Sequence, residues 1–170
     1  MYGLFNLDGT TKRLVIVFVI IFALGLFGIS KCAHSAEPYV QISAGSTYIR
    51  GPAQVLDLSF TWKAPQQENA FWKTSMTIVG DSDFHGQKAP NNLMLRGEYV
   101  TGFGHFDVGL GLCWIAHPYP YNGQPMNFSL EMAYRFQRYP VTLTLTHCSD
   151  AGMQMPNYGR DLVTLGWRFK

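Results

Sequence analysis

The chain has 170 residues, enough for one domain, and a formal net charge of only +2, so it has no basic surface of the size that nucleic-acid binding requires. Aromatic residues make up 15% of the sequence and charged residues 14%, which leaves few charges to coat a surface that faces water. This composition excludes a nucleic-acid partner and indicates that part of the surface faces a different solvent.

The first segment has the order of a secretory signal. Two basic residues precede the apolar run 14–30, and the small-residue stretch 33–36 follows it. The run is short for a spanning helix, which needs about 20 apolar residues. We therefore expect a cleavable signal peptide over 1–36 and a single domain over 37–170. A retained anchor and a lipoprotein modified at Cys32 are the alternatives.

The remaining sequence contains eight runs of about ten residues in which apolar and polar residues alternate. Turn-forming residues bound each run, and no segment shows a helical stripe. The pattern predicts an all-β, antiparallel, eight-stranded up-and-down barrel. The runs are 39–49, 54–62, 72–80, 92–100, 105–115, 126–136, 141–148 and 161–169.

The two faces of these runs indicate which side of the barrel meets lipid. One face is apolar and ends repeatedly in Tyr, Trp or Phe, as in the aromatic girdles of transmembrane barrels. The opposite face carries charges that nearly cancel, which suits an interior of ion pairs: Asp57, Glu98, Asp107 and Glu131 against Lys73, Arg96, Arg135 and Arg168. A closed barrel pairs every backbone group with no free edge, as lipid demands. We therefore favour a barrel embedded in the outer membrane over a soluble β-barrel or sandwich.

Connection lengths predict the orientation. Segments 101–104 and 137–140 are tight turns, whereas 81–91, 117–125 and 150–160 are longer. Barrels of this type keep short turns on the periplasmic side and long loops outside. The seventh run then climbs outward and ends at the level of the outer leaflet.

Three reactive residues share the lipid-facing side at that level. His147 and Ser149 have the parity of the apolar residues of the seventh run, and Asp161 has the corresponding parity in the eighth. Cys148 has the opposite parity, so we expect it to fill the interior. A disulfide from Cys148 to Cys113 would have to cross the sixth run.

A serine, a histidine and a carboxylate are the ingredients of acyl transfer. The imidazole can take the proton of the serine hydroxyl, and a carboxylate can fix the tautomer of the imidazole and stabilise its charged form. Residues i and i+2 of one strand face are about 7 Å apart at Cα, so their side chains must lean together. Parity alone does not distinguish catalysis from a non-catalytic role of these polar residues at the membrane interface.

The segment HCSDAGMQMPNYGRD, residues 147–161, resembles the closing motif of the outer-membrane lipid A 3-O-deacylases, the PagL family. That motif has the form His-x-Ser-Asn-Ala-Gly, a short spacer, Pro-Asn-x-Gly and an acidic residue. The resemblance covers about 15 residues and is supported by the eight-run layout. It implies a nucleophile, a general base and an orienting acid, which are Ser149, His147 and Asp161 respectively.

The resemblance also implies how the loop between these residues works. Gly152 would lend its backbone N–H to an oxyanion hole, together with position 150. Asn157 and Gly159 are residue types that shape turns, and contact with the substrate is the alternative for them. Two positions depart from the motif. Asp150 stands where Asn is usual, and its carboxylate cannot donate to an oxyanion. Asp161 is one methylene shorter than the expected Glu.

The resemblance implies an esterase that removes the 3-O-linked acyl chain of lipid A in lipopolysaccharide, with no cofactor and no metal. The oligomeric state is left open, and a homodimer is one alternative. Two other functions remain as alternatives. One is a non-catalytic small barrel for adhesion or envelope integrity, and the other is a lipid A acyltransferase of similar architecture.

Overall fold

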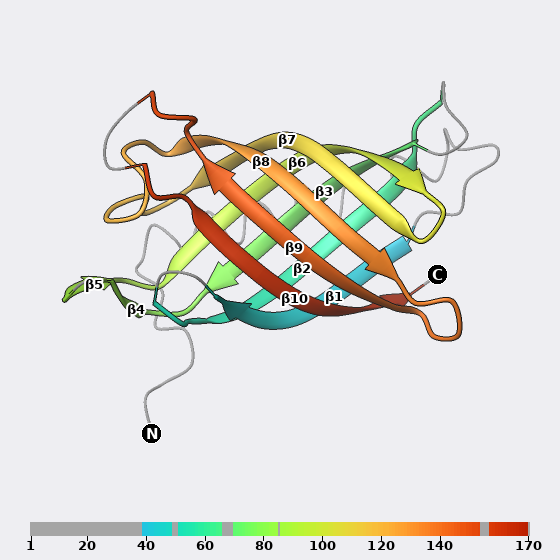
Figure 1. Cartoon of the computed structure of the whole chain (residues 1–170), viewed down its shortest axis with the longest axis horizontal. Coiled ribbons are helices and arrows are strands. Elements are labelled where there is room, and N and C mark those ends of the chain that lie inside the picture. Colours follow the sequence, from blue (N-terminus) through green and yellow to red (C-terminus); the bar gives the residue numbers. More distant parts are fainter. Residues whose placement is uncertain (1–38, 49–50, 66–69, 85, 154–156, 170) are drawn as a thin grey trace.

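The structure, a computed structural model, describes residues 39–48, 51–65, 70–84, 86–153 and 157–169. Eight long strands form a closed antiparallel barrel (Figure 1). They are β1 (Tyr39–Thr47), β2 (Gln54–Lys63), β3 (Ala70–Val79), β6 (Asn92–Phe103), β7 (Phe106–Ile115), β8 (Met126–Arg135), β9 (Val141–Ser149) and β10 (Arg160–Phe169). The expected all-β, eight-stranded fold is therefore confirmed. The expected signal peptide, 1–36, lies outside the described residues.

Each long strand pairs with its neighbours in sequence, and β1 closes the barrel against β10. The connections that join β1 to β2, β3 to β6, β7 to β8 and β9 to β10 gather at one end, the long-loop end (Figure 1). The opposite end, the short-turn end, holds the turns from β6 to β7 and from β8 to β9. This arrangement agrees with the expected places of the turns 101–104 and 137–140 and of the loops 81–91, 117–125 and 150–160.

The barrel is apolar outside and polar inside, because side chains alternate across each strand. Along β9 the outward residues Leu143 and Leu145 are exposed, whereas Thr142, Thr144 and Thr146 are buried in the lumen. Aromatic side chains contact one another near the short-turn end, where the ring centroids of Phe106 and Tyr134 are 5.1 Å apart. The outer surface therefore has the composition of a lipid-facing wall.

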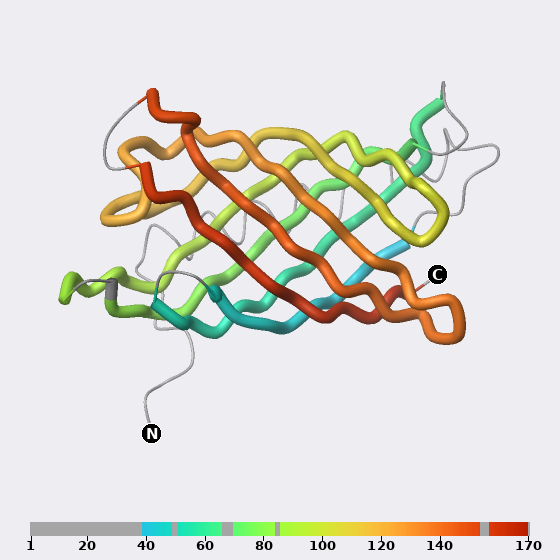
Figure 2. Tube along the Cα trace, in the orientation of Figure 1, coloured from blue at the N-terminus to red at the C-terminus, as the bar shows by residue number. Residues whose placement is uncertain are grey.

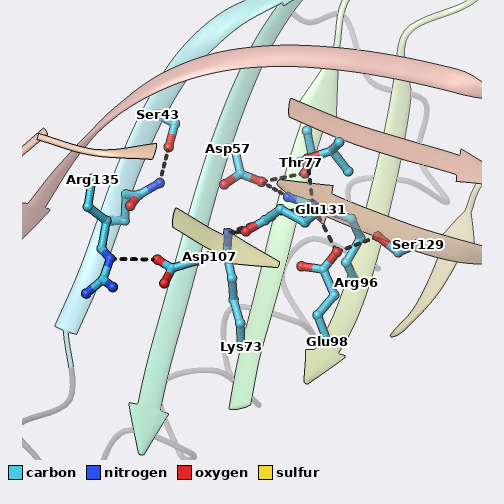
Figure 3. A network of polar contacts seen from close by, with 12 residues as sticks. Ser43, Asp57, Lys73, Thr77, Arg96, Glu98, Asp107, Ser129, Glu131 and Arg135 are labelled. Carbon is cyan, nitrogen blue, oxygen red and sulfur yellow. Dashed lines mark hydrogen bonds and ion pairs between the residues drawn. The ribbon is translucent and has the colours of Figure 1, made fainter. Parts of the chain in front are cut away.

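Ion pairs fill the middle of the lumen (Figure 3). Arg96 on β6 contacts three carboxylates, Asp57 at 2.9 Å, Glu131 at 3.1 Å and Glu98 at 3.3 Å. Lys73 on β3 lies 2.6 Å from Glu131. We name these five residues the interior ionic cluster. The sequence-based expectation of mutual ion pairs inside the barrel is confirmed.

The lumen changes character toward the long-loop end, where buried apolar side chains replace the charges. These side chains belong to Ala53, Val55, Val79, Met94, Cys113, Ile115, Cys148 and Leu162. Cys113 and Cys148 are both free thiols. Cys148 and Leu162 directly follow His147 and Asp161 in the chain, so this apolar plug backs the wall that carries the predicted triad.

The connection from β3 to β6 contains a short hairpin, β4 (Ser82–Phe84) with β5 (Gln87–Ala89), which projects from the long-loop end (Figure 1). The sequence predicted a long connection over 81–91 and did not predict the hairpin inside it. Three-residue strands contain too little alternation to be recognised. No helix in the described part of the chain is long and apolar enough to cross a membrane.

Candidate active site

Strand pairing places His147 directly beside Asp161. The two residues are register partners on β9 and β10, and His147 Nδ1 lies 2.7 Å from Asp161 Oδ1. The Asp161 side chain is only 10% exposed, whereas the imidazole is 43% exposed. The carboxylate therefore holds one ring nitrogen against the wall, and the remainder of the ring stays accessible.

Ser149 lies two residues beyond His147, at the last position of β9. Both residues have the outward parity of Leu143 and Leu145. Ser149 is half-buried and is the register partner of the exposed Phe128 on β8. Within the described residues the Ser149 hydroxyl does not hydrogen-bond to the imidazole. Catalytic hydrogen bonds in structures without substrate are often longer than in the reacting complex.

Gly159 lies against the imidazole. A Cβ at this position would be 2.5 Å from His147 Cε1 and 3.2 Å from Nε2, and the residue has a φ of +73°. Glycine is therefore required here twice, for the left-handed backbone and for the space that the ring occupies. The sequence predicted only that Gly159 shapes the loop, because its contact with the ring depends on the fold.

The two predicted oxyanion residues lie in one tight turn. Met153 N–H donates to the Asp150 carbonyl at 3.2 Å, and the central residues Ala151 and Gly152 both have positive φ, +56° and +83°. This is the pattern of a type I′ turn, in which a non-glycine residue at positive φ costs about 1 kcal/mol. Asp150 is buried, and its carboxylate accepts the Gly152 N–H at 3.0 Å. The Gly152 N–H thus already has an acceptor in this arrangement.

The Asn157 side chain contacts this turn. Its Oδ1 accepts the Asp150 N–H at 3.2 Å. Its amide nitrogen, Nδ2, would be 3.9 Å from a Cβ placed on Gly152. Asn157 was predicted to shape the loop, and these contacts also put a side-chain donor beside the predicted oxyanion glycine.

Tyr48 continues the row of outward residues past Asp161. Its backbone N–H donates to the Asp161 carbonyl at 3.3 Å. Partial burial and, secondarily, the Asp161 carboxylate raise the pKa of the Tyr48 phenol above its ordinary value. The phenol therefore stays protonated and can donate a hydrogen bond at neutral pH. Sequence reasoning missed this residue, because it directly follows β1, the strand that closes the barrel against β10.

The described residues bring no three His, Cys, Asp or Glu side chains together in a way that could hold a metal ion.

No family model matches the sequence, and no curated protein matches it. Two solved structures are similar to the barrel. The first is a crystal structure of the outer membrane enzyme PagL, with a TM-score of 0.56 and 18% identity, covering 77% of this chain and 98% of that one. The second is the Yersinia pestis outer membrane protein Ail in a phospholipid bilayer nanodisc, with a TM-score of 0.50, 8% identity and coverages of 79% and 100%.

Both neighbours are outer-membrane barrel proteins, and at these identities the likeness establishes the fold alone. The chain has the architecture of a small outer-membrane barrel. Any activity has to be argued from the side chains at the rim.

Proposed function

We propose that the protein is an outer-membrane esterase that hydrolyses the 3-O-linked acyl chain of lipid A. The observation that carries this proposal is the 2.7 Å contact between His147 and Asp161 on the outward face of the barrel, with Ser149 on the same face of the same strand. The similarity to the fold of PagL and the motif at 147–161 support it.

The position of the site suits an ester in a membrane lipid. In a glycolipid such an ester lies where sugar meets acyl chain. In the proposed orientation the long-loop end faces outward, and the end of β9 lies at the corresponding depth of the outer leaflet. The exposed side chains of Phe128 and Leu130 beside the site offer an apolar wall for an acyl chain. The substrate would then react without leaving the bilayer.

The chemistry follows from the order of the three groups. Ser149 Oγ attacks the ester carbonyl while its proton passes to His147 Nε2, and Asp161 stabilises the imidazolium through Nδ1. The protonated ring then donates its proton to the departing sugar hydroxyl, which leaves an acyl-enzyme. Water, deprotonated by the same imidazole, releases a free fatty acid and regenerates Ser149.

The negative charge of Asp150 near the oxyanion should slow the reaction. The tetrahedral intermediate carries a negative oxygen, and backbone or amide donors stabilise it. The amide of Asn157 and the N–H of Gly152 are the candidate donors, but the Asp150 carboxylate competes for the Gly152 N–H. We therefore expect slower turnover than with an asparagine at position 150.

Lipid A mass spectrometry of cells that express the protein tests the proposal. Wild-type protein should remove the mass of one hydroxyacyl chain from lipid A. In Ser149→Ala this mass change should disappear, because the rate of deacylation should fall at least about 1,000-fold. Ser129→Ala is the matched control, because Ser129 is an inward-facing serine on the adjacent strand. It should leave the mass loss intact.

The same experiment separates the alternatives. A non-catalytic barrel predicts an unchanged lipid A spectrum with wild type and Ser149→Ala alike. An acyltransferase predicts that the removed chain appears on another lipid. The esterase predicts free fatty acid.

A further inference from the structure

A buried asparagine in the neighbouring loop contacts the backbone between the proposed base and nucleophile. Asn122, in the connection from β7 to β8, is fully buried. Its amide nitrogen donates to Asn127 Oδ1 at 2.7 Å and to the carbonyl of Cys148 at 3.3 Å. Cys148 is the residue that separates His147 from Ser149.

The main chain of Asn122 and of its neighbour Tyr121 is joined to Asn157 and Tyr158, which precede β10. Asn122 and Asn157 form an isolated antiparallel bridge, and Tyr158 N–H donates to the Tyr121 carbonyl at 2.7 Å. The two loops run side by side at the long-loop end (Figure 2). Asn122 thus contacts both the strand that carries Ser149 and the loop that carries Asn157.

Hydrogen bonds continue from Asn157 to the predicted oxyanion residues. Asn157 Oδ1 accepts the Asp150 N–H, and the Asp150 carboxylate accepts the Gly152 N–H. A displacement of Asn122 would therefore be transmitted through two further hydrogen bonds to Gly152.

The loop that carries Asn122 is itself held in place by contacts with the β4–β5 hairpin and with two barrel strands, β6 and β10. The buried Tyr121 hydroxyl pairs with Ser82 Oγ at 2.7 Å, and the Arg160 guanidinium lies 4.4 Å from the centre of the Tyr121 ring. At the start of the loop, Asn92 hydrogen-bonds both the N–H and the carbonyl of His117. These contacts fix the position of the loop and therefore of Asn122.

We propose that Asn122 is a positioning residue for the esterase reaction, an inference that rests on the proposed function. A buried amide costs free energy unless its hydrogen bonds are made. The Asn122 Nδ2 makes two such bonds, whereas its Oδ1 has no hydrogen-bond partner within the described residues, so the two donated bonds are the contacts that favour an asparagine here. Asn122 fixes the carbonyl of Cys148 and the Asn157 segment relative to each other. It thereby sets the distance between Ser149 and the oxyanion donors.

Steady-state kinetics on the full chain, purified and folded in detergent micelles with lipid A as substrate, test this inference. Asn122→Ala should lower kcat about 10- to 100-fold and leave KM within about twofold, because misplacement of reacting groups penalises the transition state. Asn122→Asp keeps the side-chain volume but removes both donated hydrogen bonds, so it should lose kcat to a similar extent. Thr144→Ala is the control, at a buried polar residue in the middle of β9 whose hydroxyl has no hydrogen-bond partner within the described residues, and should change kcat less than threefold.

A double-mutant cycle separates positioning from a general loss of stability. If Asn122 acts through Asn157, the effects of Asn122→Ala and Asn157→Ala will not add, and the double variant will be no slower than the slower single variant within about twofold. Rates are expressed per folded barrel, measured by the faster gel migration of the unheated protein.

Several results would overturn the inference while leaving the esterase intact. They are a wild-type kcat in Asn122→Asp, an effect confined to KM, or additive effects in the cycle. Failure of the proposed function is different, because the wild-type protein itself would then release no fatty acid or Ser149→Ala would still release it.

Discussion

Two regions in which carboxylates lie beside basic groups differ in exposure, because the interior ionic cluster is buried and the pair at the rim is accessible. In the interior cluster, Arg96 and Lys73 form ion pairs with three carboxylates, and every member is 7% exposed or less. At the rim, Asp161 binds one nitrogen of an imidazole that is 43% exposed. The difference in exposure indicates that the contacts of the interior ionic cluster stabilise the fold, whereas the His147–Asp161 pair can act on a substrate.

The partners in the two regions also differ in their capacity to exchange protons. Arg96 keeps its proton under all ordinary conditions, so its carboxylate partners neutralise a fixed charge. A histidine changes protonation near neutral pH and can accept and return a proton within one reaction cycle. Substitutions in the interior should therefore affect the stability of the barrel, and substitutions at the rim should affect the rate of catalysis.

The largest expected effect comes from removing the charge of the rim carboxylate. Asp161→Asn keeps the size of the side chain but no longer stabilises the protonated ring, and it favours the wrong tautomer of His147. We expect fatty-acid release to fall about 10,000-fold, the size of the effect of this substitution in a serine hydrolase triad. The measurement is the initial rate of release in micelles.

Asp107→Asn is the matched control for this prediction. Asp107 is an inward-facing carboxylate of β7 whose partner is Arg135 at 3.0 Å. Its loss should change the rate less than twofold. An Asp161→Asn variant with more than a tenth of wild-type activity would show that the rim pair is only an interfacial contact.

The next effect concerns the interior. Arg96→Met would leave three buried carboxylates with only Lys73 to neutralise them. We expect the free energy of unfolding to fall by about 3–5 kcal/mol, the usual cost of breaking a buried ion pair. Tryptophan fluorescence in a denaturant series measures this change, while the rate per folded barrel should stay within twofold.

Arg135→Met provides the comparison inside the same lumen. The Arg135 side chain is 28% exposed and its ion pair lies toward the short-turn end. Solvent screens such a pair, so its loss should cost about 1 kcal/mol or less. Equal losses of stability in the two variants would contradict the assignment of Arg96 as the centre of the interior ionic cluster.

The division between inside and outside could be predicted from the sequence, because it depends only on alternation. The parity of Leu145 and His147 against Thr144 and Thr146 places each side chain on the correct face without knowledge of the fold. The contact of His147 with Asp161 also followed, since strands joined in a hairpin pair at the same end.

Depth and loop contacts could not be predicted in this way. The parity of Cys113 equals that of Asp107, yet one lies in the apolar plug and the other beside Arg135, and alternation does not report height along the barrel. Asn122 contacts Cys148 across 26 positions of sequence through a loop without periodicity. Such contacts arise only when the closed barrel brings the loops together.

The smallest of these effects tests the space beside the imidazole. Gly159→Ala would place a methyl group 2.5 Å from His147 Cε1, so the ring must turn away from its position against Asp161. We expect the rate of fatty-acid release to fall about 10- to 100-fold, because a shift of the base by a fraction of an ångström misaligns proton transfer.

Gly86→Ala separates this steric effect from backbone strain. Gly86 has a φ of +76°, close to the +73° of Gly159, but a Cβ there meets no atom within 4 Å. Both substitutions pay the same cost of about 1 kcal/mol for an alanine in the left-handed region. Only Gly159→Ala moves the ring, so a similar loss of rate in both variants would mean that backbone strain, and not the position of the imidazole, limits the reaction.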